Sequence, residues 1–168
     1  MKKFLSINNN DGVFVPKKSL IDCSASELAI LVLVTKARIF EKSELYSSAK
    51  LHVKTIRKAI STLDRKNLIY TDWHNVYGKQ FDKGVELEIR PAALLAMKVI
   101  TANELKTLYA IELLSKSNKP FNSKNISRLL QMDRGNISKA LSSLAQKGLL
   151  IQHDNDNTTH HYYSMVAD

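Results

Sequence analysis

The chain has 168 residues, 44% of them hydrophobic, which is enough for one medium domain or two small ones with a real core. Its single cysteine, Cys23, excludes an intramolecular disulfide framework and a cysteine-rich zinc site, so we expect a small buried residue. No apolar run approaches the roughly 20 residues that span a bilayer, so we expect a cytoplasmic protein with no membrane partner. The net charge of +9 makes nucleic acid the first partner to consider.

The first predicted elements are an extended segment at "GVFVPKKSL" and a helix over residues 24–38. Ser24 and Glu27 have the spacing of a capping box, which satisfies amides at a helix start. The stretch "ELAILVLV" is too continuously apolar for one amphipathic face. We expect it to be buried on several sides, between units or at a dimer interface.

A short helix over residues 42–50, a tight turn and a third helix over residues 53–66 are predicted next. One apolar stripe at helical spacing runs along the third helix, through Ile56, Ala59, Ile60 and Leu63. The following "LIYTDWHNVYGKQFDKGVELEIR" predicts a hairpin whose turn spans Gly78 to Gly84, with Trp73 alternating between core and surface on a strand.

Pro91 is expected to close the first unit, because proline cannot continue a strand ladder. "AALLAMKVI" then reads as an apolar helical connector. We therefore predict two domains packed against each other. The first, residues 1–90, includes the N-terminal extended segment, and the second, residues 91–168, includes the connector helix.

The second unit repeats the first. "SASELAIL" from Ser24 is echoed by "TANELKTL" from Thr101, and "TIRKAISTLDRKNLI" from Thr55 by "NISKALSSLAQKGLL" from Asn136. Helices are predicted over residues 101–116, 123–131 and 134–147, followed by a hairpin around Asp154 to Thr159. The same apolar stripe recurs at Ile137, Ala140, Leu141 and Leu144.

Three helices, the last two joined by a tight turn, and a hairpin resemble the winged helix-turn-helix superfamily over nearly the whole chain. "ISRLLQMDRGNISKALSSLAQKGLLIQ" is similar to the MarR-type pattern. The first unit has Asn67 where that family usually has glycine, but asparagine can adopt the left-handed conformation needed there. "GVFVPKKSL" ahead of "SASELAIL" resembles the amino-terminal winged helices of phage and plasmid replication proteins. The expected fold class is α+β, mainly α, with two tandem winged helix-turn-helix units.

This resemblance implies that the third helix of each unit lies in the major groove and that the wing touches the DNA backbone. Asp133 is suited to cap the second of these helices. The wings are expected to differ, because the first has Lys79 and Lys83 whereas the second has Asp154 and Asp156. The expected DNA-binding residues are Lys42, Lys54, Thr55, Arg57, Lys58, Ser61, Lys79 and Lys83 in the first unit, and Lys124, Arg128, Arg134, Gly135, Asn136, Ser138, Lys139 and Ser142 in the second.

The positive charge is concentrated in the second and third helices of each unit. Residues 42–66 hold seven cations and two anions, and residues 123–147 hold five cations and one anion. The excess of cations over anions in these two stretches together equals the net charge of +9, so the remainder of the chain is neutral overall. The concentration of positive charge in these helices favours a DNA-binding surface over a cationic surface without a particular partner.

No catalytic, metal-binding or cofactor-binding residues are predicted. His153, His160 and His161 are interpreted as polar hairpin residues, since no acidic or cysteine partner stands at ligand spacing. No nucleophile with a base and no glycine-rich phosphate loop is present.

The sequence favours a nucleoid-associated, sequence-specific double-stranded DNA-binding transcriptional regulator that uses its two winged helices as a pseudo-dimer. One alternative is a plasmid or phage replication initiation or maintenance protein. Another is a tandem winged-helix adaptor for protein interactions, which does not require cations on the third helices. A homodimer is compatible with each of these alternatives.

Overall fold

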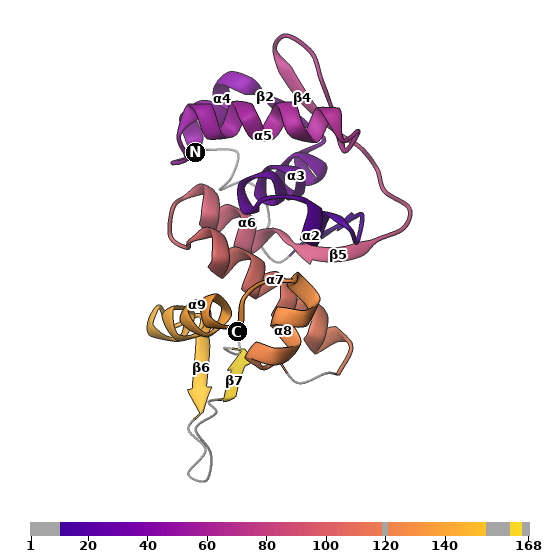
Figure 1. Ribbon diagram of the computed structural model, residues 1–168. Helices are drawn as coiled ribbons and strands as arrows, with labels where there is room; N and C mark the ends of the chain where they lie inside the picture. Colours follow the sequence, from indigo (N-terminus) through magenta and orange to yellow (C-terminus); the bar gives the residue numbers. More distant parts are fainter. Residues whose placement is uncertain (1–10, 119–120, 154–161, 166–168) are drawn as a thin grey trace. The chain divides into compact units, whose positions relative to one another are not determined.

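The computed structural model describes residues 11–118, 121–153 and 162–165, and shows an α+β, mainly helical protein (Figure 1). Its contacts divide the chain into two compact units, Met1–Ala102 and Asn103–Asp168. The division predicted from the sequence lies between residues 90 and 91. The connector instead belongs to the first unit, because its helix packs on the first long helix of that unit.

Unit 1 contains a central helix surrounded by strands and other helices (Figure 1). Its elements are β1 (Gly12–Val15), α2 (Ser19–Asp22), α3 (Ala25–Ala37), β2 (Ile39–Glu41), α4 (Lys42–Ser48), α5 (Val53–Arg65), β3 (Ile69–Thr71), β4 (Asn75–Gly78), β5 (Val85–Glu88) and α6 (Ile89–Ala96).

Helix α3 forms the centre of unit 1. It begins at the predicted capping box, in which Glu27 N donates to Ser24 Oγ and Ser24 N donates to Glu27 Oε2, both at 3.2 Å. Every residue from Leu28 to Val34 is buried, and α3 contacts α5, α6, β1 and β4. The expected burial on several sides is therefore confirmed, and the covering elements belong to the same unit. Cys23, just before this helix, is buried as predicted.

Two small antiparallel sheets flank α3. Strands β2, β4 and β3 form one sheet in that order, and their inward side chains Phe40, Val76 and Ile69 are buried. Strand β1 pairs with β5, with Val13 opposite Leu87. This ribbon joins the beginning of the unit to a segment near its end.

The hairpin predicted around Gly78 to Gly84 is wrong. The turn instead spans Asp72 to His74 and joins β3 to β4, whereas residues 79–84 lead to β5. Both glycines serve close packing. A Cβ on Gly78 would lie 2.5 Å from Val34 O, and one on Gly84 would lie 2.0 Å from Val15 O.

Pro91 also has a different role from the expected one. It lies in the first turn of α6, where a missing N–H removes no helical hydrogen bond. The proline therefore does not end the unit. The α4–α5 turn is attached to this helix by a hydrogen bond from Lys50 N to Ala96 O of 2.7 Å.

Unit 2 has the same order of three helices and a two-stranded hairpin. Its elements are α7 (Ala102–Lys116), α8 (Ser123–Leu130), α9 (Arg134–Gln146), β6 (Leu150–His153) and β7 (Tyr162–Met165). The two predicted strands are confirmed as an antiparallel pair, with Leu150 opposite Met165. The predicted tip with Asp154 and Asp156, and the side chains of His153, His160 and His161, lie outside the described residues.

Helices α5 and α9 end in the same way. Asn67 and Gly148 follow them with φ of 60° and 75°, as expected for the left-handed position. The next amide returns to the helix in each case. Leu68 N donates to Leu63 O at 3.0 Å, and Leu149 N donates to Leu144 O at 2.9 Å. In the described part of the chain, no helix is long and apolar enough to cross a membrane.

Candidate nucleic-acid interface

Helix α5 has one buried and one cationic face. Its apolar stripe, from Ile56 to Leu63, is buried as predicted. The side chains predicted to contact DNA all lie on the exposed part of the helix: Lys54, Thr55, Arg57, Lys58 and Ser61. His52 is the N-cap of this helix, and its Nδ1 accepts from Lys54 N at 3.2 Å. This bond fixes the start of the helix beside the first exposed lysine.

Helix α9 also has one buried face and one exposed face, and its exposed face has fewer cations. Asp133 caps it as predicted, because Asp133 Oδ2 accepts from Asn136 N at 3.3 Å. A Cβ on Gly135 would lie 2.9 Å from that carboxylate oxygen, so the cap itself favours glycine there. Arg134 Nη2 donates to Ser123 Oγ at 3.5 Å. The predicted residues of this helix are exposed, apart from half-buried Ser142: Arg134, Gly135, Asn136, Ser138 and Lys139.

The second helices contribute cations at their surfaces. Lys124 and Arg128 on α8 are exposed, and Lys42 at the start of α4 is half-buried. Throughout residues 11–118, 121–153 and 162–165, Lys54, Lys58 and Lys139 have no carboxylate partner. Their charges therefore remain available to an anionic partner.

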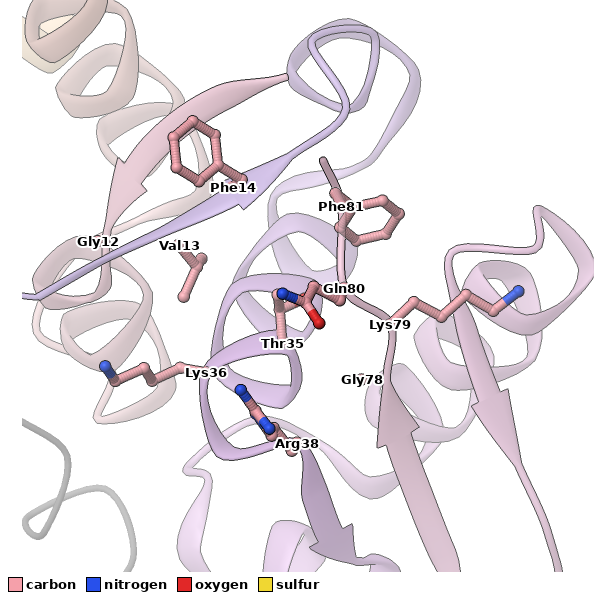
Figure 2. Close-up of a pocket in the computed structure, with 10 residues that line it drawn as sticks. All are labelled: Gly12, Val13, Phe14, Thr35, Lys36, Arg38, Gly78, Lys79, Gln80 and Phe81. Atoms are coloured by element: carbon pink, nitrogen blue, oxygen red, sulfur yellow. The ribbon is translucent and has the colours of Figure 1, made fainter. Parts of the chain in front are cut away.

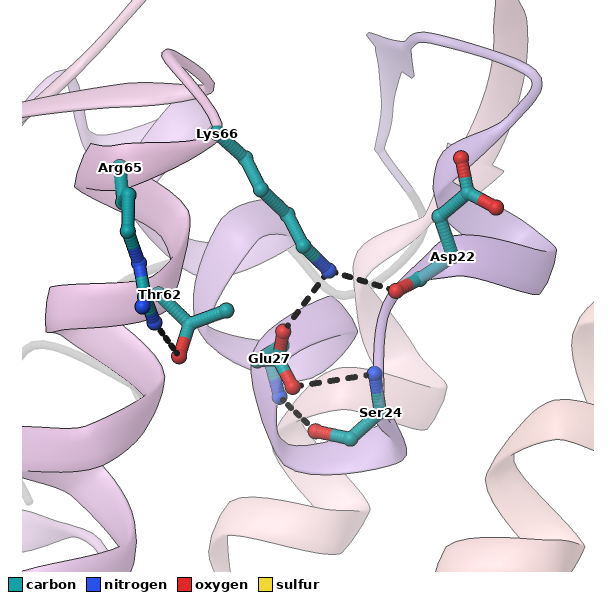
Figure 3. A network of polar contacts seen from close by, with 6 residues as sticks. All are labelled: Asp22, Ser24, Glu27, Thr62, Arg65 and Lys66. Atoms are coloured by element: carbon teal, nitrogen blue, oxygen red, sulfur yellow. Dashed lines mark hydrogen bonds and ion pairs between the residues drawn. The ribbon is translucent and has the colours of Figure 1, made fainter.

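Two of the repeated lysines, by contrast, form ion pairs within their own units. Lys66 Nζ lies 3.2 Å from Glu27 Oε1, and Lys147 Nζ lies 2.7 Å from Glu104 Oε2. Each pair joins the start of the first helix to the end of the third. Figure 3 shows the first pair, where Lys66 Nζ also donates to Asp22 O at 2.5 Å. These lysines are thus structural, although they contribute to the charge excess noted in the sequence.

The two glutamates differ in their surroundings. The side chain of Glu104 is only 4% exposed, and its Oε1 also accepts from Ser143 Oγ at 2.9 Å. The side chain of Glu27 is 14% exposed. Burial alone raises the pKa of Glu27, but hydrogen bonds from Ser24 and Lys66 outweigh it and lower this pKa below 4.5.

The structure does not place Lys79 and Lys83 at a hairpin tip. They lie in the segment between β4 and β5, where Lys79 is half-buried and Lys83 is exposed. Figure 2 shows this segment beside a cavity of about 460 Å³, with the Lys79 side chain extending away from Arg38. Lys79 Nζ donates to Asn67 Oδ1. Lys79 therefore contacts the turn that ends α5.

The hairpin tip consists of Asp72, Trp73 and His74. Trp73 is 86% exposed, so the prediction that it alternates between core and surface on a strand is wrong. The sequence holds one signal for this tip, because Asp72 between two β-prone runs favours a turn. The glycines farther along are a stronger turn signal, so the sequence alone places the turn there.

The tip is held by one carboxylate. Asp72 Oδ1 accepts from the amides of His74 and Asn75 at 2.9 and 2.7 Å, and Asp72 Oδ2 accepts from Tyr77 Oη at 2.7 Å. The Tyr77 bond, followed by the two amide bonds, lowers the pKa of Asp72 below 3.8. The same bond to Asp72 raises the pKa of Tyr77 above 10.0. The tip is further attached to α4 by Lys42 N, which donates to His74 O at 2.8 Å.

A cleft of about 620 Å³ separates this tip from α4 and α5. Its lining includes Trp73 and His74 from the tip, Lys42 and Tyr46 from α4, and Arg57 from α5. The guanidinium of Arg57 lies over the Tyr46 ring, 5.4 Å from its centroid. The structure thus brings the predicted residues Lys42 and Arg57 together with three side chains that the sequence did not assign to the interface.

No protein-family model, curated protein or solved structure matches this chain. The assignment of function therefore depends on the site itself.

Proposed function

We propose that the chain binds double-stranded DNA in a sequence-specific manner through two tandem winged helix-turn-helix units, as a transcriptional regulator. The observation that carries the proposal is the repeated third helix. In both units it follows a short turn, buries one apolar stripe and exposes cations on the opposite side. A helix of this kind fits the major groove with its N-terminal residues toward base edges.

The arrangement of strands in unit 1 supports the same proposal. Its order is helix, strand, two helices and a two-stranded hairpin, with β4 between β2 and β3. The hairpin tip and α5 line a common cleft, so both can contact one ligand. This order of elements is the one expected for a winged helix.

The outward side chains differ between the two helices. Arg57 and Lys58 on α5 correspond to Ser138 and Lys139 on α9. Arginine forms bidentate hydrogen bonds with guanine, and asparagine does so with adenine. Because α5 has Val53 and Thr55 at the positions of Arg134 and Asn136, the two units suit unlike half-sites.

Selection of bound duplexes from a random library tests the proposal. We expect the wild-type protein to enrich a motif, and Arg57→Ala and Arg134→Ala to relax it at different positions, each by about 1–3 kcal/mol of discrimination. Lys17→Ala, a change of an exposed cation before α2, is the charge-matched control and should enrich the wild-type motif. Equal binding of all duplexes by the wild-type protein would refute sequence-specific regulation.

A further inference from the structure

Trp73 is the sole tryptophan of the chain and is 86% exposed at the hairpin tip. Tryptophan is highly buried on average, because its ring carries a large apolar surface. Its exposure here is not the result of a loose loop. Asp72 holds the amides of His74 and Asn75, and His74 O accepts from Lys42 N at the start of α4. The backbone that carries the indole is therefore held in place.

The cleft beside Trp73 has the chemistry of a base-stacking site. It contains a second aromatic ring, Tyr46, covered by the Arg57 guanidinium at 5.4 Å. Aromatic and guanidinium planes are the groups on which unstacked bases pack. A volume of about 620 Å³ lies within the range of small-ligand sites.

The polar lining can recognise the edge of a base. Glu41 and Asn75 line the cleft beside Lys42 and Arg57. A carboxylate repels phosphate but accepts hydrogen bonds from the exocyclic amino group of a base. The cations that could neutralise the adjacent backbone, Lys54 and Lys58, lie on the exposed face of α5.

From these observations we propose that the cleft binds a single unstacked nucleobase, with Trp73 stacking on it. The preferred partner is then a duplex with one unpaired base beside the segment contacted by α5. This inference rests on the proposed DNA binding by α5 and specifies the form of DNA that is bound best.

The test compares a fully paired duplex carrying the selected motif with duplexes that contain one extra unpaired adenine, whose exocyclic amino group can donate to a carboxylate, placed at each position in turn. We expect one position of the adenine to tighten binding about tenfold, which corresponds to a single stacked base. The emission of Trp73 should be quenched by that duplex, and this signal comes from the cleft alone because the chain has no other tryptophan.

Variants are compared by the anisotropy of labelled DNA. Trp73→Ala should lose the preference for the unpaired base while retaining binding to the paired duplex, and Trp73→Phe should retain most of the preference. Tyr70→Ala is the matched control, since Tyr70 is 60% exposed on the neighbouring strand β3 and does not line the cleft. It should behave as wild type, with circular dichroism confirming that each variant folds.

The possible results separate the two proposals. Equal binding of all the duplexes, with unchanged Trp73 emission, overturns the base-stacking site and leaves duplex binding by α5 intact. A preference that persists in Trp73→Ala also overturns it. Absence of binding to every duplex overturns the proposed function together with this inference.

Discussion

Each unit contains an ion pair between residues that recur in the other unit, and this ion pair is not part of the proposed interface. Glu27 with Lys66, and Glu104 with Lys147, connect the first helix of each unit to the end of the third. The repeated lysines are therefore explained by packing. An ion pair at this position fixes the third helix relative to the first, and so fixes the direction in which its cationic face points.

The two pairs should differ in their contribution to stability. In Lys147→Met the Glu104 carboxylate, 4% exposed, loses its ion pair with Lys147, and breaking a buried pair costs about 3–5 kcal/mol. Ser143 still donates to Glu104, so we expect the lower end of this range. In Lys66→Met the more exposed Glu27 keeps its bonds with Ser24, and we expect about 1 kcal/mol. Urea unfolding measures both changes, and equal losses would contradict the burial argument.

The features that depend on a residue and its near neighbours were the easiest to predict from the sequence. The capping residues Ser24 and Asp133, the left-handed Asn67 and the apolar stripes of α5 and α9 could all be inferred from sequence, because each depends on neighbours within a few positions. The ion pair of Lys66 could not be inferred from the sequence, because its partner lies far along the chain and a lysine on an amphipathic helix normally faces solvent.

At the scale of elements, the hairpin shows where the sequence misleads. Glycine marks turns, but it also marks places where backbones approach closely. Gly78 and Gly84 belong to the second class, since each faces a backbone carbonyl oxygen. The partner of β5 is β1, and pairing between distant segments leaves no local pattern. The same is true of the candidate site. The cations of α5 could be predicted from the sequence, whereas the tip with Trp73 could not.

The pH dependence of the hairpin tip follows from Asp72. Its pKa is lowered in the folded protein, so its contribution to stability is present above the unfolded value of 3.8 and is lost as pH falls through the folded pKa. We expect Trp73 emission to change with a midpoint below pH 3.8. Asp72→Asn, which cannot titrate, should lack this change, and circular dichroism separates it from global unfolding. If Asp72→Asn shows the same change in Trp73 emission, a group other than Asp72 is responsible for that change.

For the whole molecule, the two units are not electrostatically equivalent. The exposed face of α5 includes Lys54, Arg57 and Lys58, whereas that of α9 has Arg134 and Lys139. A denser group of cations attracts phosphate more strongly and releases more counterions. Unit 1 is therefore expected to provide most of the salt-dependent affinity.

Three double variants test this asymmetry on one duplex at several salt concentrations. Lys54→Ala with Lys58→Ala should lower the slope of log affinity against log salt by about 1.8, or about 0.9 for each phosphate contact. Arg134→Ala with Lys139→Ala should lower it less. Lys17→Ala with Lys18→Ala, which removes two exposed cations at the turn before α2, should leave the slope unchanged. Equal slopes for all three would mean that only the net charge matters.

The ribbon of β1 and β5 has a consequence for synthesis on the ribosome. Gly12–Val15 is made before the other strands of unit 1, yet its hydrogen-bonding partner Val85–Glu88 is made only after α5 and the sheet of β2, β4 and β3. Until then, the edge of β1 carries unsatisfied backbone groups, and the side of α3 that α6 covers in the folded unit is exposed. Completion of unit 1 is therefore a late, long-range step, and slow translation through residues 16–84 prolongs the period in which the nascent chain is open to aggregation or chaperone binding.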